Sequence, residues 1–241
     1  MDLGLAGRRA AVAAASSGLG LATAKALAAE GARVVICGRD RARLDDAVAE
    51  VGDGCTGVVR DVTGAEGGAA FVADATAALG GVDILVTNAG GPPPGDFAAT
   101  PAEAYPGALE LNLLSVVGMC KAAVPAMQQQ GWGRVVAITS VAVRQPAPEL
   151  ILSNTARAGV TGMLKTLARE VAGDGVTVNS VQPGLHATPR LVELYGGDTG
   201  ERPLGDPGDF GAVVTFLCSD QARFVTGAHL QVDGGAYAGL L

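Results

Sequence analysis

The sequence predicts an α/β fold: one doubly wound parallel sheet of about seven strands, of the Rossmann type, with helices on both faces. Two observations support this prediction. Short apolar runs alternate with longer helical stretches along all 241 residues. Several of these runs are almost entirely apolar, as parallel strands covered on both faces are. No repeat, linker or low-complexity segment interrupts the alternation, so we expect residues 1–241 to form a single domain.

The first strand, turn and helix carry the most information. Residues 10–13 read as a short buried strand, and a helix rich in alanine and leucine opens near Gly18. The turn between them has the small side chains that let the backbone approach a phosphate, at a helix N-terminus with its partial positive charge. An ordinary strand-to-helix turn is the alternative interpretation. A second strand over residues 33–37 completes a βαβ unit, and this context favours a dinucleotide site.

The later elements continue the alternation. We expect strands over residues 56–59, 82–87, 134–139, 177–181 and 230–232. We expect helices over residues 40–51, 66–79, 101–130, from 153 to 171, and 209–219, with the longest one broken or kinked near Pro125. Ligands of such sheets bind beyond the carboxyl ends of the strands, and the motifs described below fall there.

Charge and cysteine usage argue against several function classes. The net charge of −7 speaks against nucleic acid and anionic membranes as partners. The four cysteines are scattered without a CxxC pair or a nearby histidine, so we expect neither a metal site nor a disulfide. The sequence shows no signal peptide and no apolar run of transmembrane length, so we expect a cytoplasmic protein.

The segment Ala13–Gly20 resembles the glycine-rich fingerprint of the short-chain dehydrogenase/reductase family, including its 3-oxoacyl-carrier-protein reductase-like members. In that fingerprint a Thr-Gly pair leads and two more glycines follow. This chain keeps both later glycines, but Ala14 stands in the leading pair, where a positive φ would cost about 1–2 kcal/mol. The resemblance implies that the cofactor binds along Ala14, Ser16, Ser17, Gly18, Leu19 and Gly20.

The end of the second strand indicates which cofactor to expect. An acidic side chain there would accept hydrogen bonds from the ribose hydroxyls of NAD, and none is present. Arg39, with Arg41 and Arg43 nearby, would instead hold a 2′-phosphate through charge-assisted hydrogen bonds. A solvated turn arginine is the alternative. We therefore expect NADP(H) to be preferred over NAD(H).

Other segments resemble further family elements. Asp61-Val62 resembles the adenine-contacting pair, although Asp61 is equally plausible as a helix cap. Asn88-Ala89-Gly90 resembles the Asn-Asn-Ala-Gly element, and Asn88 would tie neighbouring strand ends together. Pro183-Gly184 and Thr188 resemble the residues that frame the nicotinamide carboxamide. The closing segment, residues 224–235, builds subunit contacts in relatives, which implies a homodimer or homotetramer.

The catalytic positions implied by the resemblance depart from the family pattern. Asn112 matches a helix asparagine associated with a local distortion and a proton-relay water, and Ser140 matches the active-site serine. Thirteen residues later, where the family has Tyr and then Lys, this chain has Ser153 and Arg157 on one helix face. A serine hydroxyl is a far weaker acid than a tyrosine. Arg157 stays protonated and would bind ribose or an oxyanion.

The substrate side is less defined. A glycine-studded loop at residues 196–200 stands where relatives carry a longer helical flap. It predicts a more open site, which favours a bulky or carrier-bound substrate, or none; the substrate is expected to be a small molecule or a carrier-bound one. His186 and Tyr195 lie in this region and are possible proton donors, but we favour ordinary loop residues.

Three functions are compatible with this scaffold. We favour an NADP(H)-dependent oxidoreductase acting on a ketone or alcohol, because the cofactor elements largely persist. A redox-neutral lyase, dehydratase or isomerase would use Ser153 and Arg157 to stabilise an enolate-like intermediate. A catalytically silent NADP-binding protein would act through its oligomer surfaces. The fold alone does not choose among them.

Overall fold

The computed structural model describes residues 1–196 and 204–240. A seven-stranded parallel sheet runs through it in the order β3-β2-β1-β4-β5-β6-β7. The strands are β1 (Arg9–Val12), β2 (Arg33–Gly38), β3 (Cys55–Val59), β4 (Ile84–Thr87), β5 (Gly133–Ile138), β6 (Val176–Pro183) and β7 (His229–Val232). The strand order reverses between β1 and β4, the switch point of a doubly wound sheet. The predicted fold class is confirmed.

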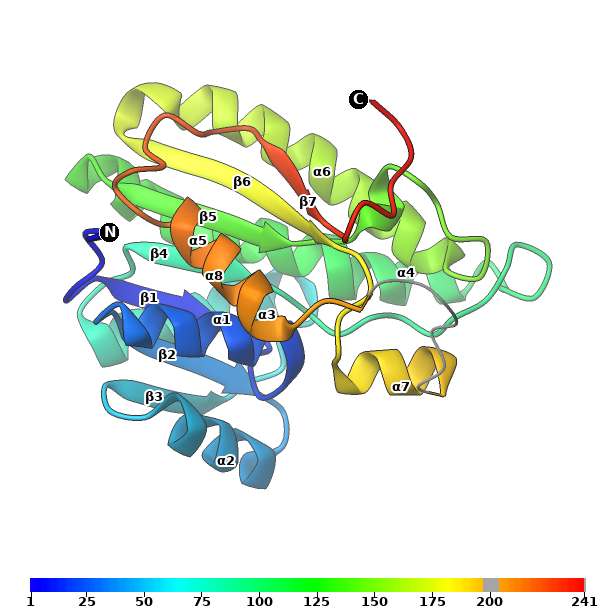
Figure 1. The fold of residues 1–241 in the computed structure, drawn as a ribbon, viewed down its shortest axis with the longest axis horizontal. Coiled ribbons are helices and arrows are strands. Elements are labelled where there is room, and N and C mark those ends of the chain that lie inside the picture. Colours follow the sequence, from blue (N-terminus) through cyan, green and yellow to red (C-terminus); the bar gives the residue numbers. More distant parts are fainter. Residues whose placement is uncertain (197–203, 241) are drawn as a thin grey trace.

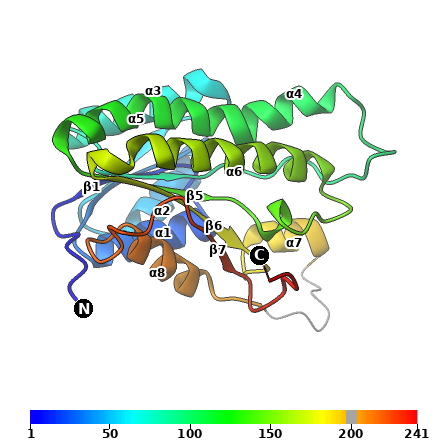
Figure 2. The same ribbon diagram turned by 90° about the horizontal axis from the view of Figure 1, so that it is seen from above.

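Helices cover both faces of this sheet (Figures 1 and 2). One face carries α1 (Gly18–Ala29), α2 (Arg41–Val51) and α8 (Pro207–Leu217), and the other carries α3 (Gly64–Leu79), α5 (Ser115–Gln130) and α6 (Ile151–Val171). Successive strand residues point to opposite faces. Val34 and Ile36 therefore join the apolar cluster under α1, whereas Val35 joins the cluster under α3 and α5.

The long helix predicted over residues 101–130 is interrupted in a different place from the one expected. It consists of α4 (Ala104–Leu109), a π-helical turn η1 (Glu110–Leu114) and α5. The expected break at Pro125 does not occur, and Pro125 lies inside α5. Because Pro125 is on the exposed side of α5, the carbonyl that its missing N–H leaves unpaired lies toward solvent. The irregularity falls on the π turn, which contains Asn112.

This long helix also corrects the expectation that no apolar run reaches membrane-spanning length. Residues Ala104–Gln130 form a 27-residue helix with a mean hydropathy of 1.4 over its most apolar 18-residue window, and 50% of that window is buried inside the fold. The helix packs so closely on α3 that a Cβ added to Gly118 would collide with the Ala65 carbonyl. Its place as an inner helix of the layer accounts for its apolar character.

Short elements complete the fold and refine the predicted boundaries. Asp40 and Asp206 cap α2 and α8, accepting from the N–H groups of Arg43 (2.8 Å) and Gly208 (2.6 Å). A helix that the sequence did not predict, α7 (Pro189–Tyr195), follows β6. Two 3₁₀ turns are present at residues 141–143 (η2) and 172–174 (η3). The predicted glycine-studded loop lies, from residue 197 onward, outside the described residues.

Candidate active site

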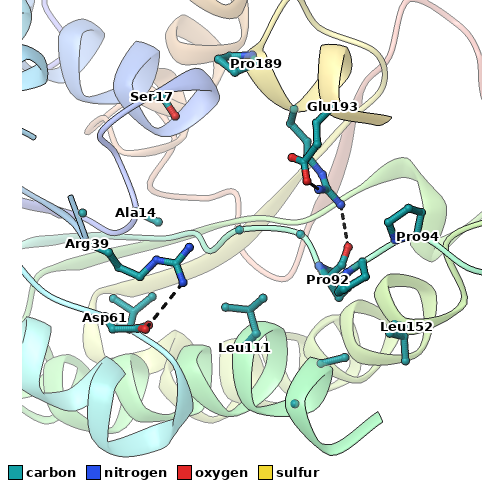
Figure 3. Close-up of a pocket in the computed structure, with 18 of the residues that line it drawn as sticks. Ala14, Ser17, Arg39, Asp61, Pro92, Pro94, Leu111, Leu152, Pro189 and Glu193 are labelled. Carbon is teal, nitrogen blue, oxygen red and sulfur yellow. Dashed lines mark hydrogen bonds and ion pairs between the residues drawn. The ribbon is translucent and has the colours of Figure 1, made fainter. Parts of the chain in front are cut away.

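A cavity of about 1180 Å³ opens at the carboxyl ends of the strands, where the strand order reverses (Figure 3). Seven of the predicted cofactor residues line it: Ala14, Ser16, Ser17, Arg39, Asp61, Val62 and Gly90. We call this part the cofactor end. The opposite part, which we call the substrate end, is lined by Pro92, Pro93, Pro94, Leu111, Leu152, Arg190 and Glu193.

Ala14 adopts the positive-φ conformation that the family fingerprint would require of a glycine at this position. Its φ is +46°, and among the described residues no other non-glycine residue has a positive φ. The neighbouring structure holds it there, because its N–H donates to Cys37 Sγ (3.3 Å) and its carbonyl accepts from Asn88 Nδ2 (3.1 Å). Burial raises the pKa of the Cys37 thiol to about 12, so this acceptor stays neutral. These two hydrogen bonds therefore hold Ala14 in a conformation that costs about 1–2 kcal/mol.

The rest of the turn forms a cradle in which added side-chain atoms would clash. A Cβ on Gly20 would lie 2.9 Å from Asn88 Nδ2 and 3.0 Å from the Ala14 carbonyl oxygen. Ser17 precedes α1 with extended backbone, and its side chain makes no capping hydrogen bond. The first N–H groups of a helix lack intrahelical acceptors. Together with the Ser17 hydroxyl at the cavity wall, they suit a phosphate.

The outer part of the cofactor end is charged and open to solvent. The Arg39 side chain is 78% exposed and the Asp61 side chain 54%, and their closest N and O atoms are 3.9 Å apart. Asp61 accepts hydrogen bonds from the Thr63 hydroxyl (2.7 Å) and N–H (2.9 Å). These bonds, and more weakly the charge of Arg39, hold the pKa of Asp61 below its usual value. Asp61 therefore shapes the turn before α3 and also faces the cavity.

Arg157 and Ser153 lie one turn apart near the start of α6 and form a hydrogen-bonded unit with the end of β5. Arg157 Nε donates to Ser153 Oγ (3.2 Å), and Nη1 donates to the carbonyl oxygens of Ile138 (3.1 Å) and Thr139 (3.2 Å). Burial, with a smaller contribution from the charge of Arg190, lowers the pKa of Arg157 to about 10. Arg157 is therefore still a cation at neutral pH.

Ser140 and Asn112 each make a hydrogen bond to the backbone. Ser140 follows β5, and its Oγ accepts from the Ala142 N–H (3.1 Å). Asn112 Nδ2 donates to the Gly90 carbonyl (2.9 Å), while its buried Oδ1 has no hydrogen-bond partner among the described residues. A second cavity of about 10 Å³ is lined by Asn112 and Arg157, and also by Asn88 and Ala89. None of the four predicted catalytic residues lines the large cavity; the adjacent Leu152 does.

The two serine hydroxyls are hydrogen-bonded in the same way. Ser140 Oγ and Ser153 Oγ each accept from a fixed donor, which leaves each O–H hydrogen available to donate. Two hydroxyl donors and a guanidinium near one strand end are groups that stabilise negative charge on an oxygen. None of them is a group that exchanges protons easily at neutral pH.

The remaining predicted residues are distributed around this centre. Pro183 ends β6, and a Cβ on Gly184 would lie 2.8 Å from Asp233. Thr188 precedes α7, and its methyl group lies 3.6 Å from the position of a Cβ on Gly18, so it faces the turn between β1 and α1. Leu19 packs against the apolar cluster under α1.

His186 and Tyr195 do not line the large cavity. His186 is buried with its ring edge-on to Phe210, at 5.2 Å between centroids. The Tyr195 hydroxyl donates to Glu149 Oε1 (3.2 Å).

Sequence reasoning missed Arg190 and Glu193, which α7 brings to the cavity. Arg190 Nη2 donates to the Pro92 carbonyl (2.8 Å), and Nη1 pairs with Glu193 Oε1 (2.7 Å) (Figure 3). The only signal in the sequence was that Arg190 follows Thr188 by two residues.

Comparisons with known proteins agree with this geometry. A family model described as enoyl-(acyl carrier protein) reductase matches residues 13–237. The human "dehydrogenase/reductase SDR family member 4" is 37% identical over 244 residues, covering 96% of this chain and 88% of that protein. L-sorbose reductase from Gluconobacter frateurii, solved with NADPH and L-sorbose, is 31% identical with a TM-score of 0.92, and each chain is covered completely (100%).

A third relative is the NADPH-bound short-chain oxidoreductase from Pseudomonas aeruginosa PAO1, described as containing an atypical catalytic center. It is 30% identical with a TM-score of 0.88, covering 97% of this chain and 99% of that one. The family model and these relatives extend over nearly the whole chain, including the turn, strand ends and helix that build the site. The chain therefore belongs to the short-chain dehydrogenase/reductase family.

Proposed function

We propose that this protein is an NADP(H)-dependent oxidoreductase that interconverts a ketone and an alcohol, with Ser153 and Arg157 at the positions where the family has Tyr and Lys. The observation that carries the proposal is the unit at the end of β5. There Arg157 holds Ser153 by a 3.2 Å hydrogen bond, while two backbone carbonyls fix the guanidinium.

The residues of the cofactor end fit a dinucleotide phosphate. Their turn has the tight backbone approach at Gly20 and the open helix start at Ser17 that a pyrophosphate needs. Ala14, Ser16, Ser17, Gly18 and Gly20 would hold the phosphates, and Asp61, Val62 and Asn88–Gly90 would border the adenosine. Pro183, Gly184 and Thr188 would frame the carboxamide. When bound, the reduced nicotinamide supplies the hydride.

The choice of NADP(H) rests on Arg39. Its exposed guanidinium is free to rotate toward a 2′-phosphate, because its contact with Asp61 at 3.9 Å is weak. No acidic side chain ends β2. The solved relatives from G. frateurii and P. aeruginosa, both NADPH complexes, support the same choice.

The side chains of this chain would stabilise the oxygen of the substrate. The hydroxyls of Ser140 and Ser153 would donate to the carbonyl oxygen, and Arg157 would offset the negative charge that develops there. Ser153 would hold the developing alkoxide by its hydroxyl hydrogen bond, with the neighbouring cation offsetting the charge, until the alkoxide takes a proton from solvent. Asn112, on the π turn, would order a water in the small cavity beside Arg157.

We extend the proposal to the setting of the protein. We propose a cytoplasmic homodimer or homotetramer with a small-molecule or carrier-bound substrate, and neither nucleic acid nor membrane as a partner. The net charge of −7 and four free cysteines support this view. Exposed apolar side chains favour self-association: Phe216 on α8, Phe224 in the segment between α8 and β7, and Leu230 on β7.

The test is binding and turnover with both cofactors. We expect NADPH to bind, as measured by calorimetry, and to be consumed when activated ketones are supplied, with Ser153→Ala slowing this consumption. If neither NADPH nor NADH binds, the proposal is wrong. Binding with rapid, Ser153-dependent conversion of a substrate but no NADPH consumption would establish the redox-neutral alternative instead.

A further inference from the structure

Arg190, on α7, is a charged group that lines the substrate end of the cavity and contacts Gly91, Pro92 and Glu193. We propose that Arg190 binds a carboxylate of the substrate, so that the reaction of this protein acts on an oxo acid or hydroxy acid rather than on a neutral carbonyl compound. This inference rests on the proposed function and names its substrate class.

The first support is the fit of the guanidinium to the cavity wall. Arg190 Nη2 donates to the Pro92 carbonyl at 2.8 Å. The guanidinium lies against Gly91, where an added Cβ would come within 2.6 Å of Nη2 and 2.9 Å of Cζ. The absence of a side chain at Gly91 therefore makes room for it. An arginine fixed in this way presents its remaining N–H groups with little further loss of conformational freedom.

The second support is that the counter-ion of Arg190 is easily replaced. Glu193 pairs with Nη1 at 2.7 Å, but its side chain is 66% exposed and lies on the same helix turn. Exposed pairs at this spacing contribute only a few tenths of a kcal/mol. A substrate carboxylate would take over the planar, two-pronged geometry that guanidinium groups prefer, while Glu193 returns to water.

The third support is the second cation beside it. The charge of Arg190 contributes to the lowered pKa of Arg157, so the two guanidinium groups act on each other across the site. Arg157 makes no ion pair with any residue in the described ranges. An anionic substrate between α6 and α7 would offset this repulsion, which a neutral ketone would not do.

The remaining wall of the substrate end suits the rest of such a molecule. Pro93, Pro94, Leu111 and Leu152 offer apolar surface in the same cavity. An apolar body would lie against them while its acid group meets Arg190. Benzoylformate and its methyl ester are suitable probes, because they share a phenyl ketone and the ester replaces the charged carboxylate with a neutral group.

The first experiment measures kcat/KM for both probes with saturating NADPH. We expect Arg190→Gln to lower the acid-to-ester ratio by about tenfold or more, the effect of losing a charge-assisted hydrogen-bond pair. Arg190→Lys should lower it less, and Glu193→Gln should raise it. Arg169→Gln is the matched control: it removes an exposed arginine near the end of α6, a different helix from that of Arg190, and should keep the ratio. An unchanged ratio in Arg190→Gln overturns the inference, and if NADPH affinity falls at the same time, Arg190 serves the cofactor instead.

The second experiment separates this inference from the proposed function. Benzoylformate is titrated by calorimetry into protein saturated with NADP⁺, where no reduction can occur. Binding that Arg190→Gln weakens by about tenfold supports the inference even if neither probe is ever reduced, a result that would count against the oxidoreductase alone. Reduction of the ester without Arg190-dependent binding of the acid leaves the oxidoreductase standing and overturns the inference.

Discussion

Two arginines of the assembled site, one at the cofactor end and one on α6, are held in opposite ways. At the cofactor end, Arg39 extends into solvent and reaches Asp61 only at 3.9 Å. On α6, Arg157 donates to Ser153 Oγ and two backbone carbonyls, all within 3.2 Å. The first arginine is screened by water, whereas the second replaces water as the donor for groups inside the protein.

This difference predicts how substitution of each arginine should change binding, stability and activity. Removing a screened charge changes affinity by a modest, salt-dependent amount and leaves the fold alone. Removing a buried donor leaves its acceptors without partners, so stability and chemistry fall together. Four variants examine this contrast.

The largest effect is expected for Arg157→Leu. Activity on ketones should fall by about 10²–10³, as when one charge-stabilising donor is lost. The unfolding free energy should fall by about 1–3 kcal/mol, because the Ile138 and Thr139 carbonyls lose their donor. Steady-state kinetics and urea unfolding measure the two effects. Arg169→Leu on the same helix should change neither, and full stability in Arg157→Leu would contradict the contrast between Arg157 and Arg39.

The double variant Ser153→Tyr with Arg157→Lys comes next. On the proposed assignment of Ser153 and Arg157, it supplies the family's acid and its cation on one helix face, so reduction of activated ketones should become about tenfold faster or more. Either single change should gain less, because each lacks its partner. Ser153 is buried, so near-UV circular dichroism must show that the phenol ring is accommodated. Fast turnover of a natural substrate by the parent protein, abolished in Ser153→Ala, would give Ser153 a dedicated role and contradict this view.

At the cofactor end, Arg39→Ala should remove most of the NADPH preference. We expect the parent to bind NADPH about tenfold more tightly than NADH, which corresponds to ~1.4 kcal/mol. The gap should also shrink with added salt, because the guanidinium is exposed. Calorimetric titrations with both cofactors measure the difference in affinity. Arg223→Ala, which removes an exposed arginine outside the cavity, is the control and should keep the NADPH preference. Equal affinities in the parent protein would refute the assignment.

The smallest effect is expected for Ala14→Gly. Glycine accepts a φ of +46° without the penalty of a Cβ, so dinucleotide binding should tighten a few-fold while the NADPH preference stays unchanged. Ala13→Gly makes the same chemical change one residue earlier, where φ is not positive, and should not tighten binding. Unchanged affinity in Ala14→Gly would mean that the Cys37 and Asn88 contacts already offset the strain.

The sheet and its order of elements were predictable because apolar runs and helical periodicity are local signals. β4 and β5, for example, are apolar over most of their length. Pro125 misled the prediction because a helix tolerates proline on its exposed side, and exposure is a tertiary property. The seven-residue α7 is too short for a periodic signal, so it was missed.

The site was predictable only as far as family motifs reach. The family fingerprint raised the possibility of a positive φ at Ala14, and the structure shows it. The hydrogen bond from its N–H to Cys37 Sγ was not predictable, because it joins residues 23 positions apart on two strand ends. Arg190 carries no motif, and its meaning depends on a carbonyl 98 residues away at Pro92. Such contacts are set by strand order rather than by local sequence.

The π turn at Glu110–Leu114 has a geometric consequence for the ligand. It sets the rotational phase between α4, which lines the cavity with Ala104, Gly107 and Ala108, and α5, which is packed on α3. Residues in a helix are spaced about 100° apart, so one residue fewer in this turn would rotate the α4 side chains by that angle. Different residues would then meet the ligand, with no substitution in the cavity wall. The length of the turn therefore sets which α4 side chains face the cavity.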